Sequence, residues 1–271
     1  RLVGNLYAEL HLFDGLMFKT SFGVDYNNLY RRSFSPKYDE LNASEKLSSL
    51  SNRNAWNFNW VFTNTLTYNK TFGDHTINAL LGMESLRNRY EYFTASRDGF
   101  PSDDPNFRFL DAGDVGTQKN SGAATEYSMV SYFGKLDYNY HDRYLVAFTL
   151  RRDGSSRLGN NKWGNFPSIS GAWVISSEPF FGENMFSHLK LRAGWGKIGN
   201  QSIPSNAYST MLRNNAYYNF GGSLAMPGYS IAKAGNPDVT WETTTDYNIG
   251  LDFGMLNNKL TGSIDVYNRK V

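Results

Sequence analysis

Residues 241–253, Trp-Glu-Thr-Thr-Thr-Asp-Tyr-Asn-Ile-Gly-Leu-Asp-Phe, decide the fold, because their side chains alternate in character at every step. The odd-numbered members, from Trp241 through Tyr247 to Phe253, are mostly apolar or aromatic, whereas the even-numbered members are acidic, polar or glycine. Successive side chains of a β-strand point to opposite faces, so the segment predicts a strand with one apolar and one polar face. Its length exceeds the usual five or six residues and suits a tilted strand that crosses a bilayer, which needs roughly 9–11.

The same alternation recurs along the chain and predicts about ten strands in a meander. The connections are short and long in turn, nearly throughout. Outer-membrane barrels have short periplasmic turns and longer extracellular loops, whereas a soluble sandwich mixes connection lengths and uses shorter strands. The sequence therefore predicts an all-β fold, a transmembrane antiparallel up-and-down β-barrel.

We expect strands at residues 5–12, 16–27, 56–68, 75–84, 131–140, 144–150, 165–176, 189–196, 241–253 and 260–266. We expect short turns at residues 13–15, 69–74, 141–143 and 255–259, and a loop of intermediate length at 153–164. Long polar segments are expected at residues 28–54, 87–125 and 197–240.

The charged side chains within these strands fall on the polar face, which is the strongest internal check on the barrel. A Lys or Arg facing lipid at the bilayer midplane costs roughly 2–4 kcal/mol. Their placement also predicts a wet lumen. Aromatic side chains gather near the strand ends, where the girdles of membrane barrels lie. The charged residues are Lys19, Asp25, Glu84, Lys135, Asp137, Lys190, Arg192, Glu242, Asp246 and Asp252, and the aromatic ones are Tyr26, Trp56, Tyr68, Tyr138, Tyr140, Trp195 and Trp241.

Composition bounds the function. The chain of 271 residues has no cysteine, which removes disulfides and thiolate chemistry, and its net charge of +2 gives no indication of nucleic-acid binding. No run approaches the ~18 apolar residues of a membrane helix. Arg1 and Val271 both lie in strand-like sequence, so we expect residues 1–271 to be part of a longer chain.

Seven ordered segments carry a resemblance to a known family: SYFGKLDY (131–138), DRYL (142–145), LRRDGSSR (150–157), WGNFPS (163–168), LKLRAGWG (189–196) with GNQ (199–201), NPDVTWETT (236–244) and NNKLTGSID (257–265). In these segments the sequence resembles the SusC/RagA family of TonB-dependent outer-membrane transporters. The resemblance extends from about residue 2 to residue 271 and is densest after Ser131.

The resemblance implies that residues 1–271 are the central part of a barrel of roughly 22 strands with a plugged lumen. It implies energised import of an oligosaccharide or peptide, driven by TonB, together with a SusD-like surface lipoprotein. The sequence departs from the family pattern by omission, because it contains no TonB box, no plug domain and no C-terminal closing strands.

Three features suggest chemistry, and each has a simpler interpretation. Asp153-Gly154-Ser155-Ser156-Arg157 lacks a nucleophile-elbow pattern, so a structured loop with Arg157 pairing a neighbour is favoured over a nucleophilic serine or an anion site. The acidic group near Arg97, Asp98, Asp103 and Asp104 has no EF-hand spacing, and the four His have no paired ligand spacing. We therefore expect no catalytic, cofactor-binding or metal-binding residue, and no enzymatic activity.

Aromatic side chains of the loops are the candidate contacts to a substrate or partner. They either stack on sugar rings, contact the lipoprotein partner, or pack the loop upon itself. The candidates are Trp163, Tyr208, Tyr217, Tyr218, Phe220 and Tyr229.

Three functions are compatible with the sequence. The first is a nutrient importer of the outer membrane, in contact with lipid, TonB and a lipoprotein but not with nucleic acid. The second is a passive porin or structural barrel, in which uptake does not depend on the proton-motive force. The third is a soluble β-rich glycan-binding or adhesive protein, which stays in aqueous solution without detergent.

Overall fold

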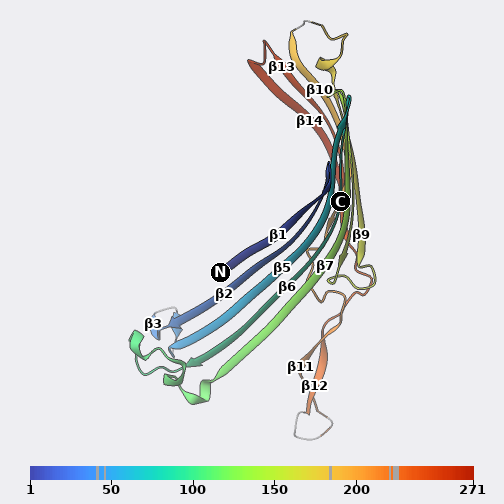
Figure 1. Cartoon of the computed structure of the whole chain (residues 1–271). Coiled ribbons are helices and arrows are strands. Elements are labelled where there is room, and N and C mark those ends of the chain that lie inside the picture. The colour runs from blue at the N-terminus through green and yellow to red at the C-terminus, as the bar shows by residue number, and fades with distance from the viewer. Residues whose placement is uncertain (41–42, 46, 183–184, 220, 222–225) are drawn as a thin grey trace. The chain divides into compact units, whose positions relative to one another are not determined.

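A computed structural model describes residues 1–40, 43–45, 47–182, 185–219, 221 and 226–271. Within these residues ten strands form one sheet, in the order β1-β2-β5-β6-β7-β8-β9-β10-β13-β14 (Figure 1). The predicted all-β meander of about ten strands is thereby confirmed. The sheet strands are β1 (Leu2–Phe13), β2 (Leu16–Ser35), β5 (Ser49–Phe72), β6 (His75–Asp98), β7 (Lys119–Tyr140), β8 (Tyr144–Ser155), β9 (Trp163–Val174), β10 (Phe186–Asn200), β13 (Glu242–Met255) and β14 (Leu260–Lys270).

Smaller elements lie in the connections. Two short hairpins pair β3 (Tyr38–Glu40) with β4 (Ala43–Glu45), and β11 (Met211–Tyr218) with β12 (Met226–Lys233). Four single-turn 3₁₀ helices are described at Pro105–Phe107, Leu110–Ala112, Val115–Thr117 and Ile175–Ser177. In the described residues no helix is long and apolar enough to cross a membrane.

The chain divides into two compact units. Unit 1 comprises residues 1–5, 23–61 and 87–127, and unit 2 comprises residues 6–22, 62–86 and 128–271. Unit 2 holds the antiparallel pairs from β7 to β14, and its register is continuous across six strands.

The register of unit 2 places apolar residues opposite apolar residues in whole rows. One row runs Leu136, Phe148, Ile169, Trp195 and Tyr247 across five neighbouring strands. We call the side of the sheet that carries this row the apolar face. Phe148 is 45% exposed and Ile249, in an adjacent row, is 61% exposed, so these side chains lie on a surface rather than in a core. The rows on the other side, the polar face, carry the charged residues that the alternation predicted for these strands: Lys135, Asp137, Lys190, Arg192, Glu242, Asp246 and Asp252.

Short turns connect the strands at one end, mostly as predicted. Gly15 has a positive φ of 84°, and a Cβ there would lie 2.4 Å from the carbonyl oxygen of Asn69, so the Asp14-Gly15 turn needs glycine. His141 and Asp142 also have positive φ values in the turn that precedes β8. The turn predicted at residues 69–74 is narrower, since β5 ends at Phe72 and β6 begins at His75.

The long polar segments predicted at 28–54 and 87–125 are wrong in extent, because the strands of unit 1 continue into them. β5 and β6 have 24 residues each, about twice what a bilayer crossing needs. Side chains join the two strands there: Arg53 donates to the Tyr90 hydroxyl at 2.9 Å and lies over the ring of Tyr92, and Asn88 donates to Asn57. A strand segment that does not face lipid needs no row of apolar side chains. A polar stretch of sequence can therefore still be a strand, and it does not show where the strand ends.

Two more boundaries differ from the prediction. Asp153 and Gly154 lie inside β8, paired with both β7 and β9, so the Asp-Gly pair makes no turn and the connection begins at Ser156. The segment predicted as one long loop at 197–240 contains the end of β10 and the hairpin β11–β12. The pairing of β11 with β12 shifts register between Arg213 and Ala216, and an extra residue in one strand interrupts the period of two.

An aromatic cluster lies at the turn end of unit 2. Tyr144 stacks on Trp173 with ring centroids 6.5 Å apart, and Trp173 meets Phe180 edge to face. Glu178 accepts a hydrogen bond from the Tyr144 hydroxyl at 2.5 Å and one from the Trp173 indole at 2.9 Å. Arg143 lies 3.5 Å from the same carboxylate. These hydrogen bonds lower the pKa of Glu178, with Tyr144 making the largest contribution and Trp173 the next.

We predict that Glu178→Ala lowers the melting temperature of the full-length protein in detergent more than Glu178→Gln does, because glutamine keeps an acceptor for both donors. The carboxyl group of Glu178 has a lower pKa in the folded protein than in the unfolded chain, where the value is about 4.3. Its ionised form therefore stabilises the folded protein at pH values above the unfolded pKa. This stabilisation is lost as the pH falls through the folded pKa. The advantage of wild type over Glu178→Gln should therefore disappear in acid, as measured by thermal unfolding at pH 7 and below pH 4. An advantage that is independent of pH would contradict this.

Candidate functional site

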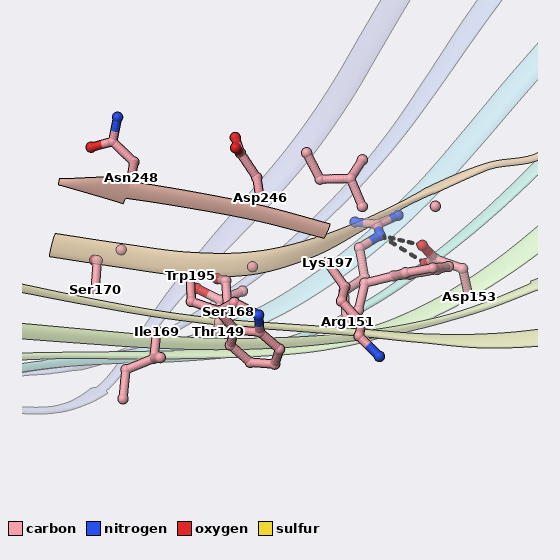
Figure 2. A pocket seen from close by; sticks show the side chains of 15 residues that line it. Thr149, Arg151, Asp153, Ser168, Ile169, Ser170, Trp195, Lys197, Asp246 and Asn248 are labelled. Atoms are coloured by element: carbon pink, nitrogen blue, oxygen red, sulfur yellow. Dashed lines mark hydrogen bonds and ion pairs between the residues drawn. The ribbon is translucent and has the colours of Figure 1, made fainter. Parts of the chain in front are cut away.

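The polar face of unit 2 forms an open trough lined by small and hydroxylated side chains. A cavity of about 570 Å³ lies along β8, β9, β10 and β13. Figure 2 shows Asp246 and Asn248 on β13 and Ser170 on β9, while the Ile169 side chain points away toward the apolar face. A second cavity of about 540 Å³ shares Ser170, Gly194 and Asn248 with the first. The trough is therefore continuous along the polar face and offers hydroxyl, amide and backbone groups.

The outer end of the trough is built around Arg151 on β8. Its Nε donates to both oxygens of Asp153, at 2.7 and 2.9 Å, and its Nη2 donates to Ser131 at 2.8 Å and approaches Glu84 at 3.3 Å. The guanidinium also lies 5.3 Å from the ring centre of Phe133. Asp153 is 7% exposed and Ser131 is fully buried, so this arginine is held in one place with its charge compensated.

A second arginine, Arg192 on β10, bridges three strands farther along. It makes a two-pronged pair with Asp252 of β13, both contacts at 2.8 Å, and reaches Asp265 of β14 at 3.2 Å. The register aligns Arg192, Gly250 and Asp265 in one row. A Cβ on Gly250 would lie 2.4 Å from an Asp265 oxygen and 2.8 Å from Arg192 Nη2. The missing side chain of Gly250 is what lets Arg192 extend across β13.

A buried apolar cluster closes the loop end of β8 and β9. Leu158, Phe166 and Trp241 form it, with Phe166 and Trp241 packed edge to face at 5.2 Å. The Trp241 indole donates to the carbonyl of Lys162 at 3.0 Å. Trp241 was predicted as the first residue of a strand and as part of a membrane girdle. It precedes β13, which begins at Glu242, and it is 7% exposed, so both expectations for it are wrong.

Glycines give Phe166 its position in this cluster. A Cβ on Gly199 would lie 2.1 Å from the Phe166 ring, and one on Gly164 would lie 2.4 Å from it. The loop is then joined to residues 236–239, since Asn160 donates to Asp238 Oδ1 at 2.9 Å and Asn161 donates to the Asp238 carbonyl at 3.1 Å. The DGSSR segment (153–157) leads into this loop from the end of β8. Arg157 contacts the Gln201 carbonyl at 3.5 Å, in line with the predicted pairing to a neighbour.

The hairpin β11–β12 carries the candidate aromatic residues, and its two faces differ. Figure 1 shows the hairpin extending beyond the ends of β9 and β10. The register pairs Leu212 with Ile231 and Tyr217 with Pro227, which places these four on one side together with Tyr229. We call this side the hairpin apolar face. Its exposed side chains are Leu212 (62%), Tyr217 (69%), Tyr229 (77%) and Ile231 (64%).

The other candidates lie elsewhere. Tyr218 is paired with Met226 on the opposite side of the hairpin, and Tyr208 precedes β11 and is 37% exposed. Trp163 begins β9 and shares the apolar face of the sheet with Ile169, so it is not grouped with the hairpin. Phe220 lies outside the described residues. The aromatic candidates are therefore not one cluster.

Sequence reasoning missed Arg151 and Asp265 as members of the polar-face clusters. The strand predicted at 144–150 ends one residue before Arg151, and Asp265 belongs to the polar set of the strand predicted at 260–266. Extending the alternation of the 144–150 segment by one step places Arg151 on the face opposite Phe148 and Leu150.

The acidic residues near Arg97 have structural partners. Lys119 lies 3.0 Å from Asp98, Asp104 accepts from the backbone N–H of Asn106 at 2.9 Å, and Arg97 donates to the Gly113 carbonyl at 3.3 Å. Across the described part of the chain, no group of three or more His, Asp or Glu side chains is arranged to hold a metal ion.

We predict that Gly250→Ala uncouples Arg192 from Asp265. In wild type, Asp265→Asn should lower the free energy of unfolding by about 0.2–1 kcal/mol, as for a partly exposed ion pair, and in the Gly250→Ala background it should cost nothing further. The measurement is a double-mutant cycle from unfolding of the full-length protein in detergent.

Gly171→Ala is the matched control, because a Cβ there meets only the Leu145 carbonyl oxygen at 3.7 Å. An equal effect of Asp265→Asn in wild type, Gly171→Ala and Gly250→Ala would refute the bridging role of Gly250.

Comparison with known proteins connects this architecture to one family. A family model described as "TonB dependent receptor-like, beta-barrel" matches residues 3–271. The chain is 34% identical over 269 residues to TonB-dependent receptor P3 of Formosa agariphila, covering 98% of this chain and 26% of that protein. It is 46% identical over 165 residues to TonB-dependent receptor SusC of Bacteroides thetaiotaomicron, covering 58% of this chain and 16% of that protein.

Solved structures agree with these relatives. A structure of the RagAB peptide transporter superposes with a TM-score of 0.85 at 29% sequence identity, covering 98% of this chain and 29% of the matched chain. The RagAB peptide importer in its "open-open" state gives a TM-score of 0.86 at the same identity and coverage. This chain thus spans about a quarter of the length of its full-length curated relatives. It belongs to the TonB-dependent receptors of the SusC/RagA family, and its strands are part of an outer-membrane β-barrel.

Proposed function

We propose that the full-length protein carrying residues 1–271 imports a nutrient, an oligosaccharide or a peptide, across the outer membrane. Import is energised through TonB and uses a SusD-like surface lipoprotein as partner. The observation that carries the proposal is the family match over residues 3–271, supported by likeness to an importer named for peptides. The soluble glycan-binding alternative is set aside by the outer-membrane location of the family.

The chemistry of the polar face favours polar cargo without a large net charge. In a membrane barrel of alternating strands, the apolar face meets lipid and the polar face meets the lumen. Both arginines that border the trough are compensated, Arg151 by Glu84 and Asp153, and Arg192 by Asp252 and Asp265. Between them the trough offers Ser168, Ser170 and Asn248, among other small groups. Such hydroxyl and amide groups hydrogen-bond sugar hydroxyls or peptide groups equally well.

We predict that uptake through the full-length protein requires energy. In cells that depend on this protein for growth on a defined oligosaccharide or peptide mixture, an uncoupler or loss of TonB should reduce uptake to background within minutes. The measurement is accumulation of radiolabelled cargo. Uptake that continues after the proton-motive force collapses would instead support the passive porin.

The hairpin apolar face is the proposed contact to the lipoprotein. Exposed Leu212, Tyr217, Tyr229 and Ile231 on one side of a two-stranded ribbon resemble the aromatic and aliphatic anchors of protein interfaces. Residues 206–235 also contain no Asp or Glu, while Arg213 and Lys233 are both basic, so the hairpin suits a partner surface that is apolar with an acidic rim.

We predict that Tyr217→Ala combined with Tyr229→Ala weakens binding of the SusD-like lipoprotein by tenfold or more, because truncation of interface anchors costs over 1 kcal/mol each. The measurement is a titration of the full-length barrel with the lipoprotein purified without its lipid anchor. Met226→Ala is the matched control, since Met226 is 55% exposed on the opposite side of the same hairpin.

If both variants bind the lipoprotein like wild type, the hairpin apolar face is not its contact. If only cargo affinity falls, the face contacts substrate, and the proposed partner site is wrong while the import function stands.

A further inference from the structure

Arg152 is a charged residue of the apolar face that has no acidic partner among the described residues. Arg152 follows Arg151 on β8, and the strand period sends it to the opposite side, in the row Tyr132, Arg152, Asn165. Its side chain is exposed, and its described interaction is with a ring: the guanidinium lies 5.2 Å from the ring centre of Trp163. The adjacent acid, Asp153, is on the polar face and is engaged by Arg151. Among the described residues, no carboxylate lies within ion-pair distance of Arg152.

The platform beneath Arg152 is shaped by the backbone. Trp163 pairs with Gly154 of β8, and a Cβ on Gly154 would lie 2.9 Å from the indole ring, so the ring occupies the place of a side chain. Tyr132 of β7 stacks on the same indole, with ring centres 6.2 Å apart and planes 23° apart. Trp163 is 46% exposed and Tyr132 is 49% exposed. Arg152, Trp163 and Tyr132, which we call the Arg152 cluster, thus form a fixed and accessible surface.

The Arg152 cluster lies at the height where the outer lipid headgroups are expected. On β8 the apolar face reads Tyr144, Val146, Phe148, Leu150, and then Arg152 and Gly154. Ten residue steps from Tyr144 to Gly154 measure about 34 Å along the strand, or about 25 Å along the membrane normal at a tilt near 40°. That matches the apolar band of roughly 25 Å between the two aromatic girdles of such barrels. Tyr144 belongs to the girdle at the short turns, so the Arg152 cluster belongs to the girdle at the long loops.

We propose that the Arg152 cluster binds the phosphate of a lipid headgroup in the outer leaflet. Arginine presents a planar fork of donors that matches two phosphate oxygens, and an aromatic platform fixes the fork without neutralising its charge. Lys162, exposed in the connection immediately before Trp163, adds a second positive charge. The Tyr132 and Trp163 rings contact the acyl-chain boundary below the headgroup, as interfacial aromatic side chains do.

The test is native mass spectrometry of the full-length protein in detergent with monophosphorylated lipid A as the probe. Wild type should retain the lipid, and Arg152→Gln should retain it about tenfold less, the usual effect of losing a charge-assisted hydrogen bond. Arg152→Lys should fall between them, because it keeps the charge but loses the fork. Trp163→Leu should also weaken retention, since it removes the platform.

Two further arms separate the source of the phosphate. Dephosphorylated lipid A should be retained poorly by wild type, and inorganic phosphate at millimolar concentration should not displace the lipid. Arg31→Gln is the matched control, because Arg31 is an exposed arginine of β2 outside the cluster and its loss removes the same charge. Thermal unfolding without added lipid checks that the variants are folded.

The proposal is overturned if Arg152→Gln retains the lipid like wild type or if Arg31→Gln loses it equally. It is also overturned if wild type retains the dephosphorylated lipid equally well, or if inorganic phosphate displaces the lipid.

Discussion

Cross-strand register is the constraint on which this structure depends. In hydrocarbon each unpaired backbone N–H or C=O costs several kcal/mol, so every strand that crosses the membrane must be paired on both sides. A shift of one residue in the pairing of a strand would turn its apolar side chains toward the lumen and its polar side chains toward lipid. The unbroken alignment from Leu136 through Phe148 and Ile169 to Tyr247 fulfils both requirements together, because one register pairs the backbone and keeps apolar residues on one face.

Glycines in the strands determine where long side chains go. Because Gly250 has no side chain, Arg192 can reach Asp265, two strands away. Because Gly154 has none, the ring of Trp163 packs directly on the backbone of β8. Gly199 and Gly164 likewise accommodate the ring of Phe166. A glycine by itself weakens a strand. In each of these cases a neighbouring side chain covers the exposed backbone at the glycine and restores stability to the strand. The glycine positions therefore specify cross-strand contacts that hydropathy does not reveal.

The parts of the fold that alternate against lipid were predictable, and the parts outside lipid were not. Residues 144–150 and 260–266 showed a clear period of two because one of their faces must be apolar. β5 and β6 continue well beyond that region, where pairs such as Arg53 with Tyr90 replace the apolar row, and no period marks their ends. Trp241 fitted the period by residue type but is held by Phe166 and the Lys162 carbonyl, contacts between distant segments that local sequence does not encode.

Arg151 and Arg152 are adjacent arginines whose surroundings differ because successive side chains of a strand point to opposite faces. Arg151 points to the polar face, where Glu84, Asp153 and Ser131 surround it and fix its charge in place. Arg152 points to the apolar face, where its guanidinium lies 5.2 Å from the ring centre of Trp163. A guanidinium on a lipid-facing wall is tolerated near the interface, where its charge reaches water and headgroups, but is costly at the midplane. The position of Arg152 one row beyond Leu150 is consistent with that limit, and it places an uncompensated positive charge where anionic headgroups are found.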